Sequence, residues 1–161
     1  MASTVSITLT YAAPPDQVAA LLRDPAFREE VTRGQRAVRA SVTVAGDAAA
    51  PKVTVDSTQA ADKVPGFAKK FVGDEIRIVQ EETWRSAHAA DVAITIPGKP
   101  GEVTGTTRLD AADGGAGTTQ VVDLSVAVRI PLVGGKIEGL IGDMLTKALR
   151  VQERVAAQRL G

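Results

Sequence analysis

The polar residues best placed to do chemistry are Gln80 and Glu82, in a segment of alternating residue types from position 75 to 85. The alternation predicts a β-strand whose inward face begins with apolar residues such as Ile78 and then carries both polar side chains and Trp84. A carboxylate buried without a partner is costly or has its pKa raised. Glu82 therefore requires either a polar pocket between the layers of the fold, or exposure to solvent at a bulge or sheet edge.

The single histidine, His88, follows Trp84 across a short turn and shares the alternating phase of Ile94. A hairpin at this turn could place His88 opposite Glu82 or Trp84, and a Glu–His pair provides general acid and base groups. The alternative is a surface histidine at the end of the hairpin. Because no Gly-x-Ser-x-Gly elbow occurs in the chain, acyl transfer is not expected.

The composition excludes several other kinds of site. With no cysteine and one histidine, the chain offers no thiolate nucleophile and no cysteine-rich or two-histidine metal site, so we expect neither a metal nor a cofactor. Lysine and arginine number 19, aspartate and glutamate also number 19, and aromatic residues make up 3% of the chain. A neutral chain with few stacking platforms is not expected to bind nucleic acid.

Targeting signals are also missing from the sequence as given. Its first sixteen residues lack a basic stretch followed by an unbroken apolar run. No segment reaches the roughly 18 consecutive apolar residues of a transmembrane helix. We therefore expect a cytoplasmic protein without a transmembrane segment, and its oligomeric state is left open.

The order of elements is predicted by the spacing of apolar residues. A half-buried strand over residues 5–11 is followed by two short helices, the first starting near Pro15 and the second ending near Gly34. Period-two alternation then continues for about a hundred residues, interrupted by Gly and Pro at positions that suit hairpin turns. This pattern predicts six further strands in an antiparallel meander.

The chain ends with an amphipathic helix that runs from Ile137 to at least Val155. At 100° per residue, its apolar side chains fall within an arc of about 140°. A stripe of this length needs a broad apolar surface to cover, and the concave face of the predicted sheet is the one available. The stripe consists of Leu140, Ile141, Met144, Leu145, Ala148, Val151 and Val155.

Inward-facing residues of the strands and of the terminal helix are candidates to line a cavity between the two layers. Many of them are small, which leaves room for a void but also allows the layers to approach and fill it. Both outcomes therefore stay open. The candidates for ligand binding are Ile78, Gln80, Glu82, Trp84, His88, Ile94, Thr107, Leu124, Val126, Ile141, Met144, Leu145 and Ala148, with Val42 and Val55 as further lining residues.

The segment from residue 64 to 72 interrupts the meander and contains two of the three phenylalanines, Phe67 and Phe71. Pro65 suits the start of a short helix, on which the two rings, four residues apart, share a face. This segment is a candidate lid over the cavity or a surface for transient contact with a membrane. The alternative is that both rings plug the end of the sheet.

Two stretches, VPGFAKKFVGDEIRIVQEETW (residues 64–84) and IPLVGGKIEGLIGDMLTKAL (residues 130–149), resemble an actinobacterial family of unknown function within the START-like superfamily, also called SRPBCC. The resemblance covers essentially the whole chain. It implies one START-like domain over residues 1–161 with the α+β helix-grip fold that the element order also predicts. In this fold a curved antiparallel sheet of about seven strands wraps around a long C-terminal helix, with two short helices after the first strand.

Members of the wider superfamily bind lipids, sterols and polyketides, and some are cyclases or aromatase-like enzymes. The closer family has no assigned chemistry, so the resemblance identifies no catalytic residue. Our leading hypothesis is non-enzymatic binding or carriage of a small hydrophobic ligand, lipid or polyketide-like, with its polar end oriented by Gln80, Glu82 and His88. Replacement Glu82→Leu is then expected to change ligand choice with little loss of stability.

Two alternatives belong to different classes. The first is a cyclase or dehydrase that uses Glu82 and His88 as acid and base. The second is a protein-interaction module with a filled core, in which Phe67 and Phe71 contact a partner.

Overall fold

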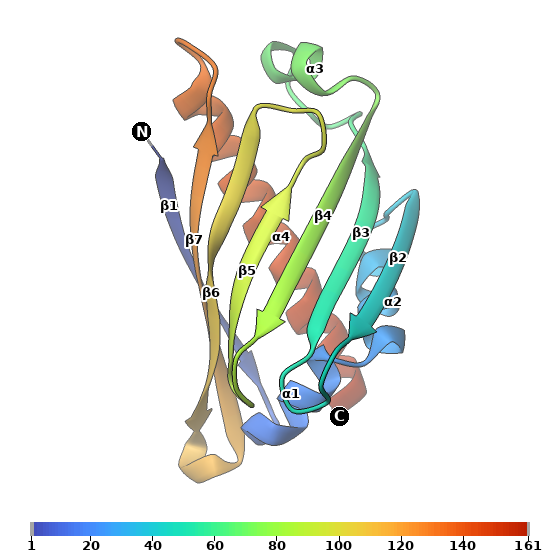
Figure 1. Cartoon of the computed structure of the whole chain (residues 1–161), viewed down its shortest axis with the longest axis vertical. Helices are drawn as coiled ribbons and strands as arrows, with labels where there is room; N and C mark the ends of the chain where they lie inside the picture. Colours follow the sequence, from blue (N-terminus) through green and yellow to red (C-terminus); the bar gives the residue numbers. More distant parts are fainter. Residues whose placement is uncertain (1, 161) are drawn as a thin grey trace.

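The computed structural model describes residues 2–160, which form seven strands and four α-helices. All seven strands belong to one antiparallel sheet in the order β1-β7-β6-β5-β4-β3-β2 (Figure 1). Sequence neighbours from β2 to β7 are also neighbours in the sheet, as a meander requires, and β1 joins beside β7. The strands are β1 (Ser3–Tyr11), β2 (Arg39–Ala45), β3 (Lys52–Ala60), β4 (Glu75–Trp84), β5 (Ala89–Thr95), β6 (Gly101–Ala112) and β7 (Gly117–Val128).

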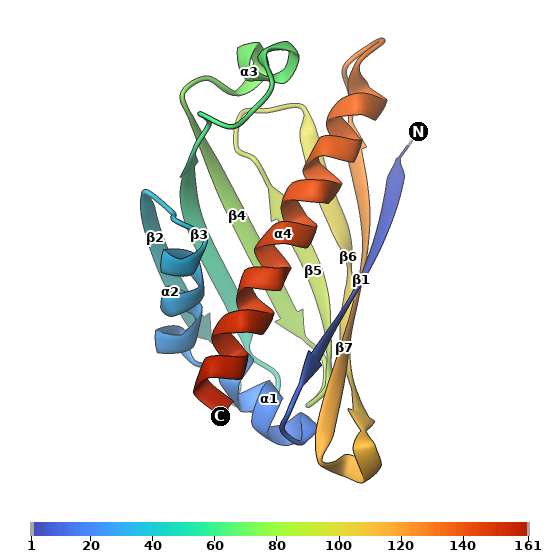
Figure 2. The same ribbon diagram turned by 180° about the vertical axis from the view of Figure 1, so that it is seen from behind.

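Helix α4 (Gly134–Leu160) crosses one face of the sheet diagonally (Figure 2). It packs on β1, β7 and α2, and its 27 residues give it a length of about 40 Å. The shorter helices are α1 (Pro15–Leu22), α2 (Pro25–Gly34) and α3 (Gly66–Val72). Helices α1 and α2 lie near the C-terminal end of α4, and α3 lies near its N-terminal end (Figure 2).

Local sequence accounts for these boundaries. Pro25 occupies the first turn of α2, where its missing N–H costs nothing, and the Asp24 side chain accepts a hydrogen bond from the Ala26 N–H at 3.0 Å. Asp113 and Gly114 adopt positive φ in the short 3₁₀ turn between β6 and β7, where glycine avoids a steric penalty.

The free edge of β1 is covered by side chains of α4. Arg150 Nη1 donates to the Thr8 carbonyl at 3.0 Å, and Glu153 Oε2 accepts from the Thr10 N–H at 2.8 Å. These contacts satisfy backbone groups that an edge strand leaves unpaired. The terminal helix therefore fixes this side of the sheet as well as covering it.

The helix-grip architecture expected from the sequence is confirmed, with small shifts of boundary. The last strand ends at Val128, and the terminal helix begins at Gly134, three residues before the apolar stripe. No helix among residues 2–160 combines the length and hydropathy needed to cross a membrane.

Glu138, in the first turns of α4, ties three elements together. It is 4% exposed, and its carboxylate accepts from Ser3 Oγ at 2.6 Å and from the Val128 N–H at 2.9 Å. These two hydrogen bonds, that of Ser3 first, hold the pKa of Glu138 below its ordinary value.

We expect Glu138→Gln to lower the free energy of unfolding at pH 7. Because the pKa of Glu138 is depressed in the folded chain, its contribution is complete above the ordinary glutamate pKa and is lost as the pH falls through the folded value. Urea titrations of both proteins between pH 7 and pH 3 measure this. The gap in stability should be widest at pH 7 and should narrow in acid, and a gap independent of pH would contradict the account.

Candidate functional site

The half of the sheet farthest from β1 is not closely covered by α4. Helix α4 packs on β1 and β7, whereas β2, β3 and β4 make no comparable contact with it among the described residues. Side chains on the inner face of these strands and on the facing side of α4 are only partly buried. They are Val42, Val44, Val55, Ile78 and Gln80 from the strands and Ile141, Met144, Leu145, Ala148 and Val151 from the helix.

Inward-pointing apolar side chains that stay accessible to solvent indicate that the two layers are not fully packed here. In contrast, inward-facing residues of β1, β6 and β7 such as Leu9, Val103 and Val126 are buried. We call the region between β2–β4 and α4 that these partly accessible side chains border the inner hollow. Helix α2 contacts both β2 and α4 and so bridges the two beside the inner hollow.

A buried ion pair lies at the α2 end of the inner hollow. Arg28 of α2 is 4% exposed and Glu82 of β4 is 5% exposed, and Arg28 Nη2 lies 2.6 Å from Glu82 Oε1. Arg28 Nε also donates to the Leu22 carbonyl at 2.6 Å. Gln80 Nε2 donates to the second carboxylate oxygen of Glu82 at 2.7 Å. Each carboxylate oxygen of Glu82 therefore accepts one hydrogen bond from a protein side chain.

A second polar network adjoins this pair. Tyr11 Oη donates to Gln120 Oε1, and Gln152 Nε2 of α4 lies 3.0 Å from Tyr11 Oη. Gln120 Nε2 in turn donates to Thr107 Oγ1 at 2.9 Å. Burial raises the pKa of Tyr11 well above its ordinary value, so its phenol stays neutral. The region between the sheet and α4 is thus polar at one end and apolar at the end near α3.

The other end is closed by α3. Ala68 is buried against Val128 of β7 and Ile137 of α4, and Phe71 packs beside them half-buried. Phe67 is 40% exposed, so the two rings do not plug the sheet together. Ile141 contacts both this small cluster and the main core, which makes α3 continuous with the inner hollow. Movement of α3 as a lid remains a prediction.

A family model described as a protein of unknown function (DUF2505) matches residues 6–160. The chain belongs to this family. Among curated proteins, it is 28% identical over 95 residues to an uncharacterized protein of Mycobacterium tuberculosis H37Rv and to one of Mycobacterium bovis. Each match covers 56% of this chain and 55% of the relative, so the chain spans about half the length of the curated relatives it matches.

Solved structures similar to this DUF2505 chain share its fold across almost the whole length. A protein of Thermus thermophilus has a TM-score of 0.68 at 18% identity, covering 98% of this chain and 97% of its own. The ZhuI aromatase/cyclase of Streptomyces sp. R1128 has a TM-score of 0.70 at 13% identity, with 99% and 94% covered. A START superfamily protein of Mycobacterium smegmatis has a TM-score of 0.60 at 14% identity, with 98% and 99% covered.

Against this fold, the candidate residues of the DUF2505 chain separate into three groups. Ile78, Gln80 and Glu82 lie on the inner face of β4, and the helix candidates Ile141, Met144, Leu145 and Ala148 line the hollow, half-buried. A second group lies in the closely packed core. It consists of Trp84, Ile94, Thr107, Leu124 and Val126.

His88 forms the third group alone. Its Nε2 lies 2.7 Å from Asp16 Oδ1, and its side chain is 42% exposed. Strand pairing joins Trp84 to Ala90, which leaves His88 in the turn beyond the last strand pair. In the structure His88 therefore pairs with Asp16 and not with Glu82, whose carboxylate pairs with Arg28.

Arg28, the partner of Glu82, was not predicted from the sequence. Helix α2 buries Phe27, Arg28, Val31 and Thr32. These four residues lie on one face of the helix, and Arg28 is the charged member of that face. The helical spacing was therefore the signal in the sequence that could have identified Arg28 as buried. Gln152 was also missed, although at 100° per residue it lies about 60° from Ile137, inside the apolar arc.

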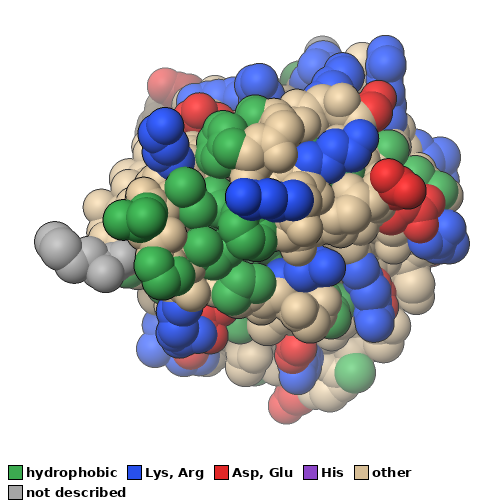
Figure 3. All heavy atoms as spheres, turned by 90° about the horizontal axis from the view of Figure 1, so that it is seen from above, with side chains coloured by type: hydrophobic (Ala, Val, Ile, Leu, Met, Phe, Trp, Pro, Cys, Tyr) green, Lys and Arg blue, Asp and Glu red, His purple; other side chains and the backbone are tan. Residues whose placement is uncertain are grey.

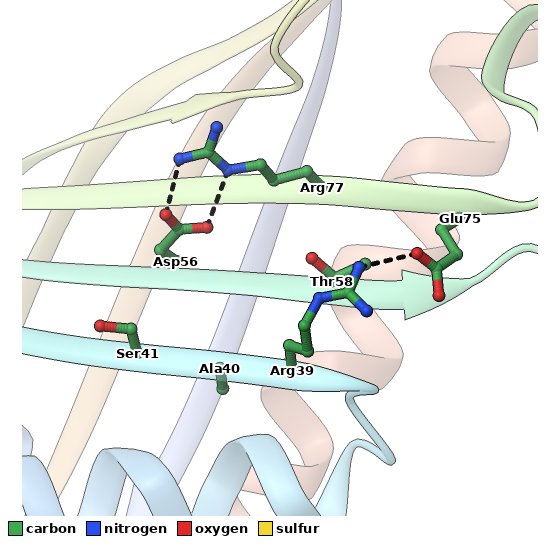
Figure 4. A pocket seen from close by; sticks show the side chains of 7 residues that line it. All are labelled: Arg39, Ala40, Ser41, Asp56, Thr58, Glu75 and Arg77. Atoms are coloured by element: carbon green, nitrogen blue, oxygen red, sulfur yellow. Dashed lines mark hydrogen bonds and ion pairs between the residues drawn. The ribbon is translucent and has the colours of Figure 1, made fainter.

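A hollow of about 500 Å³ lies on the opposite, outer face of the sheet, across β2, β3 and β4 (Figure 4). Two ion pairs cross this hollow, Arg77 with Asp56 and Arg39 with Glu75, each at 2.7 Å. The hydrogen bond from Arg77 holds the pKa of the Asp56 carboxyl below its usual range. Because Arg77 pairs with Asp56 and Arg39 with Glu75, the described side chains of this hollow offer no unpaired charge to a ligand.

Proposed function

We propose that this protein binds a small, mainly apolar molecule in the inner hollow. The observation that carries the proposal is the partial accessibility of inward-facing apolar side chains on β3, β4 and α4, beside a buried polar end. An apolar cavity with a few fixed polar groups is the usual form of a small-molecule site. Members of the START-like superfamily bind apolar molecules, which agrees with this proposal.

The polar side chains at one end of the inner hollow determine which chemical group of the ligand can bind there. Both oxygens of Glu82 are occupied by Arg28 and Gln80. Because Gln80 donates through Nε2 to a carboxylate, its Oε1 is an acceptor, and no described residue donates to it. Gln80 is half-buried at the edge of the hollow. We therefore expect the ligand to present a hydroxyl or N–H to Gln80 Oε1, and the mainly apolar border of the hollow favours an uncharged molecule.

The Arg28–Glu82 pair holds Gln80 in place and has no free carboxylate to act as a base. With His88 directed to Asp16, the arrangement favours binding over acid–base catalysis.

N-Phenyl-1-naphthylamine, an uncharged fluorescent molecule with one N–H, is a suitable probe. We expect saturable binding to the wild-type protein and affinity about tenfold weaker for Ala148→Phe, because the added ring fills part of the hollow. Ala157→Phe, on the exposed side of the same helix, is the matched control and should bind as the wild type does.

Equal affinity of the two variants for the probe would overturn this proposal, as would the absence of saturable binding to the wild type. Thermal melts of all three proteins establish that each is folded under the conditions of the titration.

A further inference from the structure

Apolar side chains gather on the surface at the α3 end of the molecule (Figure 3). Leu132, in the loop between β7 and α4, is fully exposed, and Phe67 of α3 is 40% exposed. Around them lie half-buried apolar residues of the small cluster beneath. These are Val64, Phe71, Ile130, Val133 and Leu140. We call this surface the apolar tip.

The backbone at Leu132 is strained. Its φ is 71°, in the left-handed region that side chains other than glycine and asparagine rarely adopt. Glycines occupy this region in other turns of the chain, such as Gly98 and Gly114. A fully exposed leucine gains nothing from packing, so neither local conformation nor core burial explains its presence here.

Basic side chains lie beside the apolar side chains in this view (Figure 3), and two of them are lysines close to the phenylalanine rings. Lys70 Nζ lies 5.2 Å from the centre of the Phe71 ring, and Lys136 Nζ lies 5.8 Å from that of Phe67. Among the described residues, neither lysine forms an ion pair, nor does Lys69 of α3. Three unpaired cations thus accompany the exposed apolar side chains.

We propose that the apolar tip docks on a lipid bilayer that contains anionic headgroups. Leu132 and Phe67 enter the region below the headgroups, and Lys69, Lys70 and Lys136 contact the phosphates. Apolar insertion combined with basic side chains is the physical basis of peripheral membrane binding. A symmetric contact with a second copy would bring these lysines against one another, which disfavours self-association through the same surface.

This proposal goes beyond binding in the inner hollow and does not require it. The two are adjacent, because Ile141 contacts the cluster under the apolar tip as well as the main core. Docking at the tip would place the α3 end of the hollow against the bilayer, so an apolar molecule could pass between them with little exposure to water.

Co-sedimentation with large vesicles tests the docking. We expect binding to vesicles of phosphatidylcholine with phosphatidylglycerol, weaker binding to phosphatidylcholine alone, and weakening by added salt. Leu132→Asn should lower the affinity about tenfold, because asparagine accepts the left-handed backbone but removes the apolar side chain. Val38→Asn, at an exposed apolar residue just before β2, is the matched control and should bind as the wild type does.

Leu132→Gly adds a second measurement. Glycine relieves the backbone strain, so this variant should withstand denaturant at least as well as the wild type while binding vesicles less tightly. Weaker vesicle binding by a variant that is as stable as the wild type cannot be explained by unfolding.

Failure of the wild type to bind either kind of vesicle would overturn the proposal. So would equal weakening by Leu132→Asn and Val38→Asn, or a concentration-dependent dimer in analytical ultracentrifugation that Leu132→Asn abolishes. Probe binding in the Leu132 variants should match that of the wild type, so the inner hollow and the tip are tested separately.

Discussion

Arg28→Met is expected to lower the free energy of unfolding by about 3 to 5 kcal/mol, because it leaves the carboxylate of Glu82 buried without its cation. The side chains of Arg28 and Glu82 are 5% and 7% exposed, so solvent cannot replace the missing partner. The same reasoning revises the expectation that Glu82→Leu is nearly neutral, since that change leaves Arg28 unpaired in the interior. Urea titrations at pH 7 measure both effects.

The double variant Arg28→Met/Glu82→Leu removes both charges together and should recover most of the lost stability. Arg39→Met provides the surface control, because its partner Glu75 is well exposed and such pairs contribute about 1 kcal/mol or less. Additive losses in the double variant would show that the two residues act separately and would contradict the assignment of the pair.

Gly105→Ala is expected to cost about 3 kcal/mol, at the upper end of overpacking effects. An added Cβ at Gly105 would lie 1.9 Å from the Asp123 carbonyl oxygen and 2.9 Å from Leu124 Cα, both in the backbone of the neighbouring strand. Because no side chain can move aside, β6 and β7 must separate.

Gly101→Ala, four residues earlier in the same strand, is the matched control. Its Cβ would meet Val128 Cγ2 at 3.4 Å, an ordinary contact, so thermal melting should change little. Similar melting temperatures for the two variants would mean that the strands can separate at Gly105 without cost.

Much of the fold could be predicted because each strand has one face against the core. Alternation at period two located the strands, and Gly and Pro located the turns. The apolar stripe from Ile137 to Val155 likewise predicted the terminal helix, which the structure extends to Gly134 and Leu160. These are local patterns, so they could be recognised in one sequence.

The site was less predictable because it depends on contacts between distant segments. Glu82 was correctly placed on the inner face of β4, but its partner Arg28 lies 54 residues earlier in a short helix. The position of His88 depends on strand register, and pairing of Trp84 with Ala90 carries the histidine to the surface. The exposure of Leu132 depends on how the loop before α4 folds.

Native mass spectrometry tests the central claim most directly. The protein is incubated with an organic extract of mycobacterial cells, desalted and measured beside Ala148→Phe and Ala157→Phe. Our account predicts a one-to-one complex with an uncharged, mainly apolar molecule for the wild type and Ala157→Phe, and a much smaller bound fraction for Ala148→Phe. The bare chain mass for the wild type, or equal bound fractions in the two variants, would contradict the claim that the inner hollow holds a ligand.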